Sequence, residues 1–149
     1  MPKIDPAKAP TQHGSSYPPP HDQPVRERLR QRLGDAGGLG QFGVNRLTLA
    51  PGVWSSQRHW HSHEDEFVWV LQGEVVLVTD DGEETLSAGD CAAFPAGAPN
   101  GHQLVNRSAE PAIVLEVGSR SPDDHTTYSD IDMQCGPDGV FRNKAGEPL

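Results

Sequence analysis

Residues 42–118 consist of short apolar runs separated by turn residues, and this rhythm constrains the fold more than any other feature. The turns are Pro51-Gly52, Gln72-Gly73, Asp80-Asp81-Gly82 and Gly89-Asp90. Pro, Gly and Asp supply the backbone angles of tight turns, and Asp-Gly is a strong hairpin signal. The strands expected between them span 42–50, 53–61, 65–71, 74–79, 83–86, 91–94, 102–106 and 112–118. Because no window of ten or more residues here keeps a helical period, we predict an all-β fold, an antiparallel sandwich or small barrel.

The apolar residues place the core within this same segment. Of 30 Leu, Ile, Val and Phe residues in the 149-residue chain, 21 lie in 42–118. Seven of 14 prolines lie in residues 1–24, so we expect an irregular arm there, extended or disordered, or laid against a partner subunit. Residues 25–149 are expected to form a single domain. Residues 126–142 are expected to add one or two edge strands.

Residues 25–33 permit two interpretations. Apolar side chains at 25, 29 and 33 lie four apart, which favours a short helix ended by Gly34. Arginines at 26, 28, 30 and 32 alternate, which favours a strand with one charged face. We favour the strand. Its arginines would form an anion or phosphate site or a solvated edge that discourages aggregation, and the solvated edge is the preferred interpretation.

Composition excludes several classes of protein. The net charge of −9 argues against a broad nucleic-acid-binding face, which needs clustered positive charge. The apolar runs are much shorter than the roughly 20 residues of a membrane-spanning helix, so we expect no membrane partner. We expect no secretory signal peptide in residues 1–10, which lack an apolar segment. Two cysteines provide no disulfide framework, and a cytoplasmic protein is predicted.

Histidines and a carboxylate form the candidate metal site. His59, His61 and His63 occupy alternate positions, Glu66 follows shortly, and His102 comes after a Pro/Gly-rich loop. Alternate residues of a strand share one face, so His59 and His61 should point the same way. Imidazole and carboxylate ligands suit one divalent transition metal such as Fe, Mn, Ni or Zn. His63 lies at the expected end of the strand. We expect its side chain either to face solvent or to support one of the metal ligands.

Further polar residues near this segment are candidates for binding a substrate. Arg46 and Arg58 would hold a carboxylate or phosphate, although ion pairs on the surface are the more common role of such residues. Gln57 and Gln103 would offer hydrogen bonds to a ligand. Asn100, close to His102, is a further candidate.

Two segments resemble the motifs of the cupin superfamily. Residues 52–73, GVWSSQRHWHSHEDEFVWVLQG, resemble its first motif: glycine, five residues, HxH, three or four residues, Glu, six residues, glycine. Here six residues rather than five separate Gly52 from His59. Residues 89–106, GDCAAFPAGAPNGHQLVN, resemble the second motif: glycine, five residues, PxG, two residues, His, three residues, Asn. Asn100 stands at the family's histidine position, and His102 follows two residues later.

The resemblance implies a double-stranded β-helix, the jelly-roll barrel of cupins. It also implies a metal held by His59, His61 and Glu66, with His102 on a longer loop as fourth ligand; Asn100 in that role, or no fourth ligand, is the alternative. More narrowly, the chain resembles small single-domain bacterial cupins that are loosely named sugar-phosphate isomerase-like. That likeness implies no particular reaction.

Two classes of function follow from these residues. The favoured one is a metal-dependent enzyme, an isomerase or a dioxygenase, acting on a small polar substrate at a 3-His-1-Glu site. The alternative is a non-catalytic module that binds or senses a small molecule. A homodimer is expected, because Phe67, Trp69 and Leu71 should face outward if Glu66 faces the barrel interior, and because similar small cupins are commonly dimers.

Overall fold

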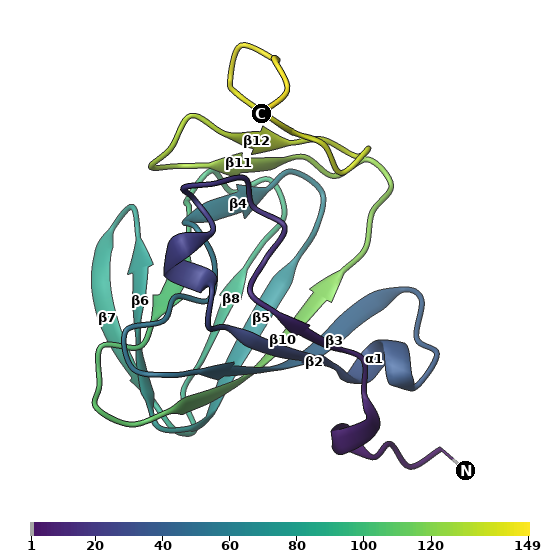
Figure 1. Ribbon diagram of the computed structural model, residues 1–149, viewed down its shortest axis with the longest axis vertical. Coiled ribbons are helices and arrows are strands. Elements are labelled where there is room, and N and C mark those ends of the chain that lie inside the picture. Colours follow the sequence, from purple (N-terminus) through teal and green to yellow (C-terminus); the bar gives the residue numbers. More distant parts are fainter. Residues whose placement is uncertain (1) are drawn as a thin grey trace.

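The protein is an antiparallel β-barrel of the jelly-roll type, described by a computed structural model of residues 2–149 (Figure 1). One sheet has the strand order β1-β2-β3-β10-β5-β8, a second β7-β6-β9 and a third β13-β12-β11-β4. The strands are β1 Thr11–His13, β2 Leu29–Arg32, β3 Phe42–Leu49, β4 His59–His61, β5 Glu66–Gln72, β6 Glu74–Thr79, β7 Gly82–Ser87, β8 Cys91–Phe94, β9 Gln103–Val105, β10 Ala112–Ser119, β11 Thr126–Tyr128, β12 Gln134–Cys135 and β13 Phe141–Arg142. The helical elements are α1 Leu33–Ala36 and the 3-10 turns η1 Pro6–Lys8 and η2 Gln23–Val25. The all-β prediction is confirmed.

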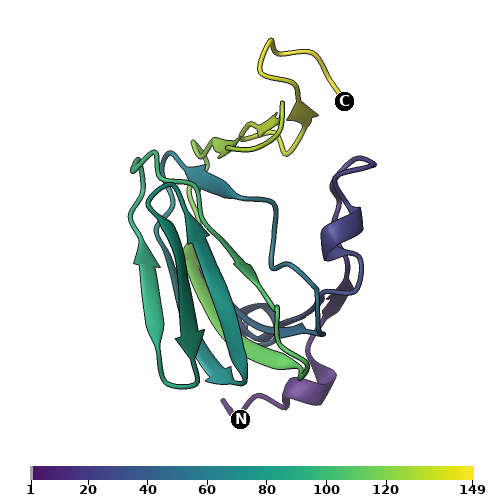
Figure 2. The same ribbon diagram turned by 90° about the vertical axis from the view of Figure 1, so that its left-hand side faces the viewer.

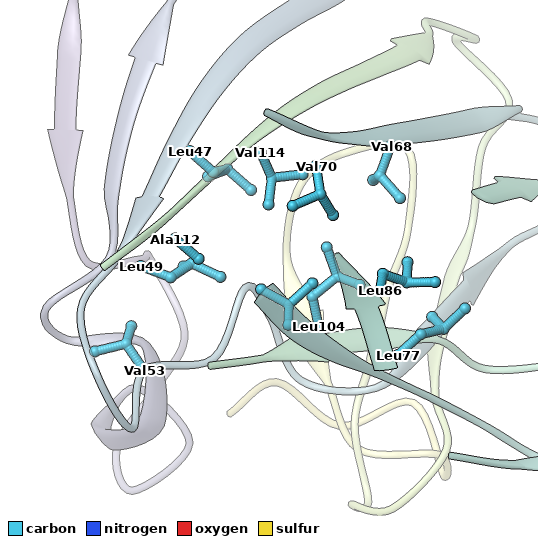
Figure 3. Close-up of a cluster of buried hydrophobic side chains, with 11 residues drawn as sticks. Leu47, Leu49, Val53, Val68, Val70, Leu77, Leu86, Leu104, Ala112 and Val114 are labelled. Atoms are coloured by element: carbon cyan, nitrogen blue, oxygen red, sulfur yellow. The ribbon is translucent and has the colours of Figure 1, made fainter. Parts of the chain in front are cut away.

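The hydrophobic core lies inside the barrel, where side chains of the six-stranded sheet meet those of the three-stranded sheet β7-β6-β9 (Figure 3). It is made of Leu47, Leu49, Val53, Val68, Val70, Val75, Leu77, Leu86, Leu104, Ala112 and Val114. Strand β5 shows the alternation that builds this core. Val68 and Val70 are buried, whereas Trp69 and Leu71 are exposed on the other face. This is the facing expected from the sequence, with Glu66 on the same side as the two valines.

The turn between β5 and β6 requires glycine. Gly73 adopts a φ of +75°, and a Cβ there would lie 2.7 Å from the carbonyl oxygen of Pro111. Both the backbone angle and the close approach exclude a side chain. The chain can therefore reverse tightly after β5, which fixes the register of the strand that begins with Glu66.

The strand expected over 53–61 is regular only from His59 to His61. Upstream, the backbone amide of Ser55 donates to the carbonyl oxygen of Leu104 at 2.8 Å. The return bond from the amide of Leu104 goes to the Ser55 hydroxyl oxygen at 2.9 Å, not to a backbone carbonyl. Because a side chain replaces the backbone acceptor, the ladder is interrupted, and β4 begins at His59.

The N-terminal arm follows an irregular path along the barrel and includes the short strand β1. Strand β1 pairs with β2, with Thr11 opposite Gln31, and the arm runs down one side of the barrel (Figure 2). The buried guanidinium of Arg28 donates to the carbonyl oxygens of Gly14 at 2.7 Å and Ser55 at 2.6 Å. Proline content predicted an irregular backbone, but it could not show that hydrogen bonds tie this backbone to the barrel.

The C-terminal segment 126–142 adds three strands, one more than the one or two edge strands expected. Strand β11 pairs with β4, with Thr127 opposite Trp60, and β12 and β13 extend this sheet at one end of the barrel (Figure 2). A turn around residues 137–139 joins β12 to β13, and Gly139 has a φ of +73°. Within residues 2–149 no helix has the length and hydropathy to cross a membrane.

Candidate metal centre and its cavity

Strands β4 and β5 and the residue before β9 position the candidate metal ligands. His59 and His61 lie on one face of β4, and Glu66 opens β5. His102 is paired with His59: each amide donates to the other residue's carbonyl oxygen, at 3.1 Å and 2.9 Å. Backbone pairing thus brings together a strand residue and a loop residue that are far apart in sequence.

The carboxylate of Glu66 lies among three imidazoles. Its Oε1 is 3.3 Å from Nε2 of His59 and also contacts Nε2 of His61. Its Oε2 is 3.3 Å from Nε2 of His102. The ligand atoms of His59, His61 and Glu66 all lie within 4.8 Å of one another, which is compatible with one shared cation. The structure therefore gathers the four residues that the sequence nominated as metal ligands.

Polar partners orient two of the imidazoles from behind. Nδ1 of His59 lies 2.8 Å from the carbonyl oxygen of Gln57, to which its N–H donates. Nδ1 of His61 lies 2.6 Å from Oδ2 of Asp124. A hydrogen bond at Nδ1 keeps a proton on that nitrogen, so that Nε2, which donates to Glu66 here, can turn a lone pair toward a metal once it gives up its own proton.

The third imidazole is held by stacking. The ring of His102 lies parallel to that of Phe94, with an interplanar angle of 1° and centroids 3.6 Å apart. Its Nδ1 is buried and has no hydrogen-bond partner among residues 2–149. The packing against Phe94 therefore fixes the plane of this ring and the direction in which its Nε2 points.

The charges of the cluster favour a bound cation. Burial alone would raise the pKa of Glu66, but hydrogen bonds from three imidazoles hold it well below its ordinary value. Burial alone would lower the pKa of His61, but Glu66 and Asp124 raise it to about 9. Burial lowers the pKa of His102. An ionised carboxylate among imidazoles can hold either a proton or a divalent metal, and the two compete.

The donor set fits one divalent transition metal. Imidazole nitrogens with one carboxylate oxygen suit Fe, Mn, Ni or Zn and leave coordination positions open. A second group of metal-binding type, made of Glu64, Asp124 and the same His61, lies behind the first. Because Asp124 accepts the hydrogen bond of His61 Nδ1, we interpret this group as the support of the first centre.

The centre faces a cavity of about 420 Å³. Its lining is polar: besides the four candidate ligands it includes Asn45 of β3, Ser56, Gln103 of β9 and Glu116 of β10. Tyr17 from the N-terminal arm and Tyr128 of β11 also line it, with their rings edge to face and centroids 5.6 Å apart. Burial raises the pKa of both phenols, so both are neutral hydrogen-bonding groups near neutral pH.

Strand β2 and the residue before it contribute three arginines to the same cavity. Residues 29–32 confirm the strand interpretation, and Arg28, Arg30 and Arg32 line the cavity. The solvated-edge interpretation is wrong for the strand, because β2 lies between β1 and β3, although the Arg32 side chain is 44% exposed. Arg26 differs from these three, since its side chain is exposed and pairs with Asp22.

Of the five predicted substrate-binding residues, Gln103 lines this cavity and the other four lie outside it. Arg46 sits on β3 between Asn45 and Leu47, which line the cavity, so its own side chain lies on the opposite face of the strand. Gln57 donates to the carbonyl oxygen of His21 at 2.9 Å. The sequence around Arg46 and Gln57 did not reveal which side of the barrel wall each side chain occupies.

The other two candidates are held by surface carboxylates. Arg58 pairs with Asp80 and with Asp130, the latter at 2.8 Å. The Asn100 side chain accepts from the amide of Asp80 at 2.8 Å and donates to Asp81 at 3.0 Å. Asn100 borders a smaller cavity of about 90 Å³ beside Trp60 and Pro95. The position of Asn100 thus differs from that of His102, which contacts Glu66.

Sequence reasoning missed Asp124 and the two cavity tyrosines. Asp124 belongs to a polar segment after β10 and has no spacing that ties it to His61. Tyr17 lies in the proline-rich arm, which we expected to be irregular. Alternating arginines were the one signal for the cavity wall, and that signal equally described a solvated edge.

Comparison with known proteins places the chain in a family. Residues 45–118 match the cupin domain model. A crystal structure of a cupin-superfamily sugar phosphate isomerase from Silicibacter pomeroyi is 50% identical, with a TM-score of 0.94, over 99% of this chain and 96% of that one. This chain belongs to the cupin superfamily, and its fold is the double-stranded β-helix.

Two further relatives are more distant. A provisionally named sugar phosphate isomerase from Acidithiobacillus ferrooxidans is 30% identical, with a TM-score of 0.69, over 78% of this chain and 70% of that one. The tetracenomycin polyketide synthase protein TcmJ of Streptomyces glaucescens is 27% identical over 83% of this chain and 80% of that protein. Relatives with different names share the fold, so the reaction must be argued from the site.

Proposed function

We propose that this protein is a metal-dependent enzyme that carries out an isomerase-like reaction on a small, sugar-like polar substrate. The observation that carries the proposal is the Glu66 carboxylate, which contacts Nε2 of three histidines on the wall of a polar cavity of about 420 Å³. Cavities of such size hold small ligands. Support comes also from the Silicibacter pomeroyi relative, which is named a sugar phosphate isomerase.

His59, His61, Glu66 and His102 would hold the metal, with His102 as the fourth ligand. A divalent metal bound there would supply Lewis-acid polarisation of a carbonyl or hydroxyl oxygen. The chain's own groups would orient the rest of the substrate. Asn45 and Gln103 line the cavity with amides, and Tyr128 lies beside His59, with ring centroids 5.8 Å apart. Such groups donate and accept hydrogen bonds, as sugar hydroxyls require.

The test is conversion of a panel of aldoses, ketoses and their phosphates by the metal-loaded protein, followed by NMR. We expect one aldose or ketose derivative to be converted to its isomer. His59→Ala should abolish both metal content and turnover. His63→Ala is the matched control, because His63 is exposed and belongs to neither group of metal-binding type.

Two outcomes would contradict the proposal. Turnover that persists in a metal-free His59→Ala protein would show that the centre is not used. Thermal stabilisation by a panel member without any conversion would identify a binding or sensing module in place of an enzyme.

A further inference from the structure

Three arginines in and just before β2 form a positively charged wall, defined here as Arg28, Arg30 and Arg32. Arg30 and Arg32 share the face of β2 that borders the cavity, and Arg28, the residue before the strand, lines the same cavity. Strand β1 covers one edge of β2 and β3 covers the other. The arginine wall therefore runs from the cavity's interior at Arg28 to its solvent-exposed rim at Arg32, whose side chain is 44% exposed.

Arg28 is a buried charge without an anionic partner. Its exposed fraction is 3%, and its two hydrogen bonds go to the carbonyl oxygens of Gly14 and Ser55. Its Nε is buried with no hydrogen-bond partner, and no carboxylate of residues 2–149 pairs with it. Burial of an unpaired charge is costly, so charged groups in protein interiors are usually compensated.

Arg30 has hydrogen-bonding capacity to spare. Its guanidinium forms an ion pair with Glu116, with Nε 2.8 Å from Oε1 but outside hydrogen-bond geometry, and Oε1 accepts a hydrogen bond from Asn45. Its terminal nitrogens bond to no other group of residues 2–149. The side chain keeps 22% of its surface exposed, so a molecule in the cavity can reach it. The guanidinium can thus offer a fork of donors to a ligand.

The wall as a whole carries excess positive charge. Arg32 lies 4.0 Å from Asp35, and the same carboxylate accepts a hydrogen bond from Arg120, which also lines the cavity. Glu116 and Asp35 are therefore the two carboxylates that pair with three of these four guanidinium groups, and Arg28 pairs with neither. A bound dianion would balance the positive charge that these two carboxylates leave unpaired. A monoanion would balance only part of that charge.

We propose that the arginine wall binds the phosphate of a phosphate-monoester substrate, with Arg30 as the principal contact and Arg28 as a supporting buried charge. A phosphate monoester carries about −1.5 to −2 charges near pH 7 and accepts the paired donors of a guanidinium. This inference rests on the proposed function, since it assigns the substrate's phosphate to the wall and its carbonyl or hydroxyl end to the Glu66 centre. It narrows the substrate class to phosphorylated sugars.

The experiment measures binding of inorganic phosphate by isothermal titration calorimetry to the wild type, Arg30→Gln and Arg26→Gln. We expect Arg30→Gln to weaken phosphate binding about tenfold or more, the usual effect of losing a charge-assisted pair. Arg26→Gln should leave the affinity unchanged, because Arg26 does not line the cavity. Arg30→Lys, which keeps the charge but loses the fork, should give an intermediate affinity and rules out misfolding as the cause.

A metal-deficient arm separates this inference from the proposed function. In His61→Ala, loss of metal with phosphate affinity retained would support the wall even if no isomerase activity were ever found. Affinity lost in His61→Ala but kept in Arg30→Gln would overturn the inference, because phosphate would then bind the metal. Acetate competing as strongly as phosphate would overturn the phosphate class and identify a carboxylate site.

Discussion

The candidate metal centre and the arginine wall, which both border the cavity, differ in how far the sequence alone predicts their residues. The candidate metal centre takes three of its four residues from positions 59–66, where alternation in a strand and a short turn bring them together. The arginine wall takes its residues from β2 and the position before it, and β2 is held between β1 and β3. Spacing over a few residues predicts which side chains share a face. It does not predict what lies opposite that face.

The largest expected effect is a loss of folding stability on substitution of Arg28, the buried residue of the arginine wall. Arg28→Met removes two charge-assisted hydrogen bonds and leaves the carbonyl oxygens of Gly14 and Ser55 without their donor. We expect a loss of about 3 to 5 kcal/mol in the free energy of unfolding. Urea denaturation measures it, with Arg26→Met as the exposed control, expected within about 0.5 kcal/mol of the wild type. Equal effects in the two variants would contradict the buried role of Arg28.

A smaller effect is expected behind the metal centre. Asp124→Asn removes the charge that supports Nδ1 of His61 while keeping the size of the side chain. Loss of such a support typically costs about 10- to 100-fold in metal affinity. Competition with a chelator measures this affinity, and Asp123→Asn is the neighbouring control. Unchanged affinity in Asp124→Asn would show that Asp124 has no part in the centre.

Substitutions on the outer face of β5 are expected to change the oligomeric state and to have the smallest effect on the cavity. Trp69 and Leu71 are 46% and 48% exposed there, while Val68 and Val70 are buried on the inner face. The homodimer remains a prediction, and light scattering tests it. We expect a mass of twice the chain's 16.1 kDa at micromolar concentration, and a mass near one chain for Trp69→Lys/Leu71→Lys with its metal content unchanged. A monomeric wild type would contradict the prediction.

Much of the fold could be predicted because turn residues and strand alternation are local signals. The buried face of β5 follows from alternation alone, and the strand at 112–119 was expected to within one residue. The break upstream of His59 was not predicted, because it depends on the hydroxyl of Ser55 replacing a backbone acceptor. Sequence alone does not show that exchange.

The candidate site could be predicted in part for the same reason. The ligand positions follow from spacing and from the cupin motifs, whereas Arg46 and Arg58 were nominated only for lying near them. The structure directs Arg58 to Asp80 and Asp130 and places Arg46 on the outer face of β3. The groups that do line the cavity, such as Tyr17 and Arg28, come from a segment whose docking depends on contacts distant in sequence.

Metal analysis of the freshly purified protein, by plasma mass spectrometry, tests the central claim most directly. The account predicts close to one Fe, Mn, Ni or Zn ion per chain, nearly complete loss in His61→Ala, and full retention in His63→Ala. Fe would favour chemistry with O₂, whereas Zn or Mn would favour the isomerase-like reaction. A wild type without metal, even after reconstitution with each of these ions, would contradict the account and leave the histidines as a polar lining of a binding cavity.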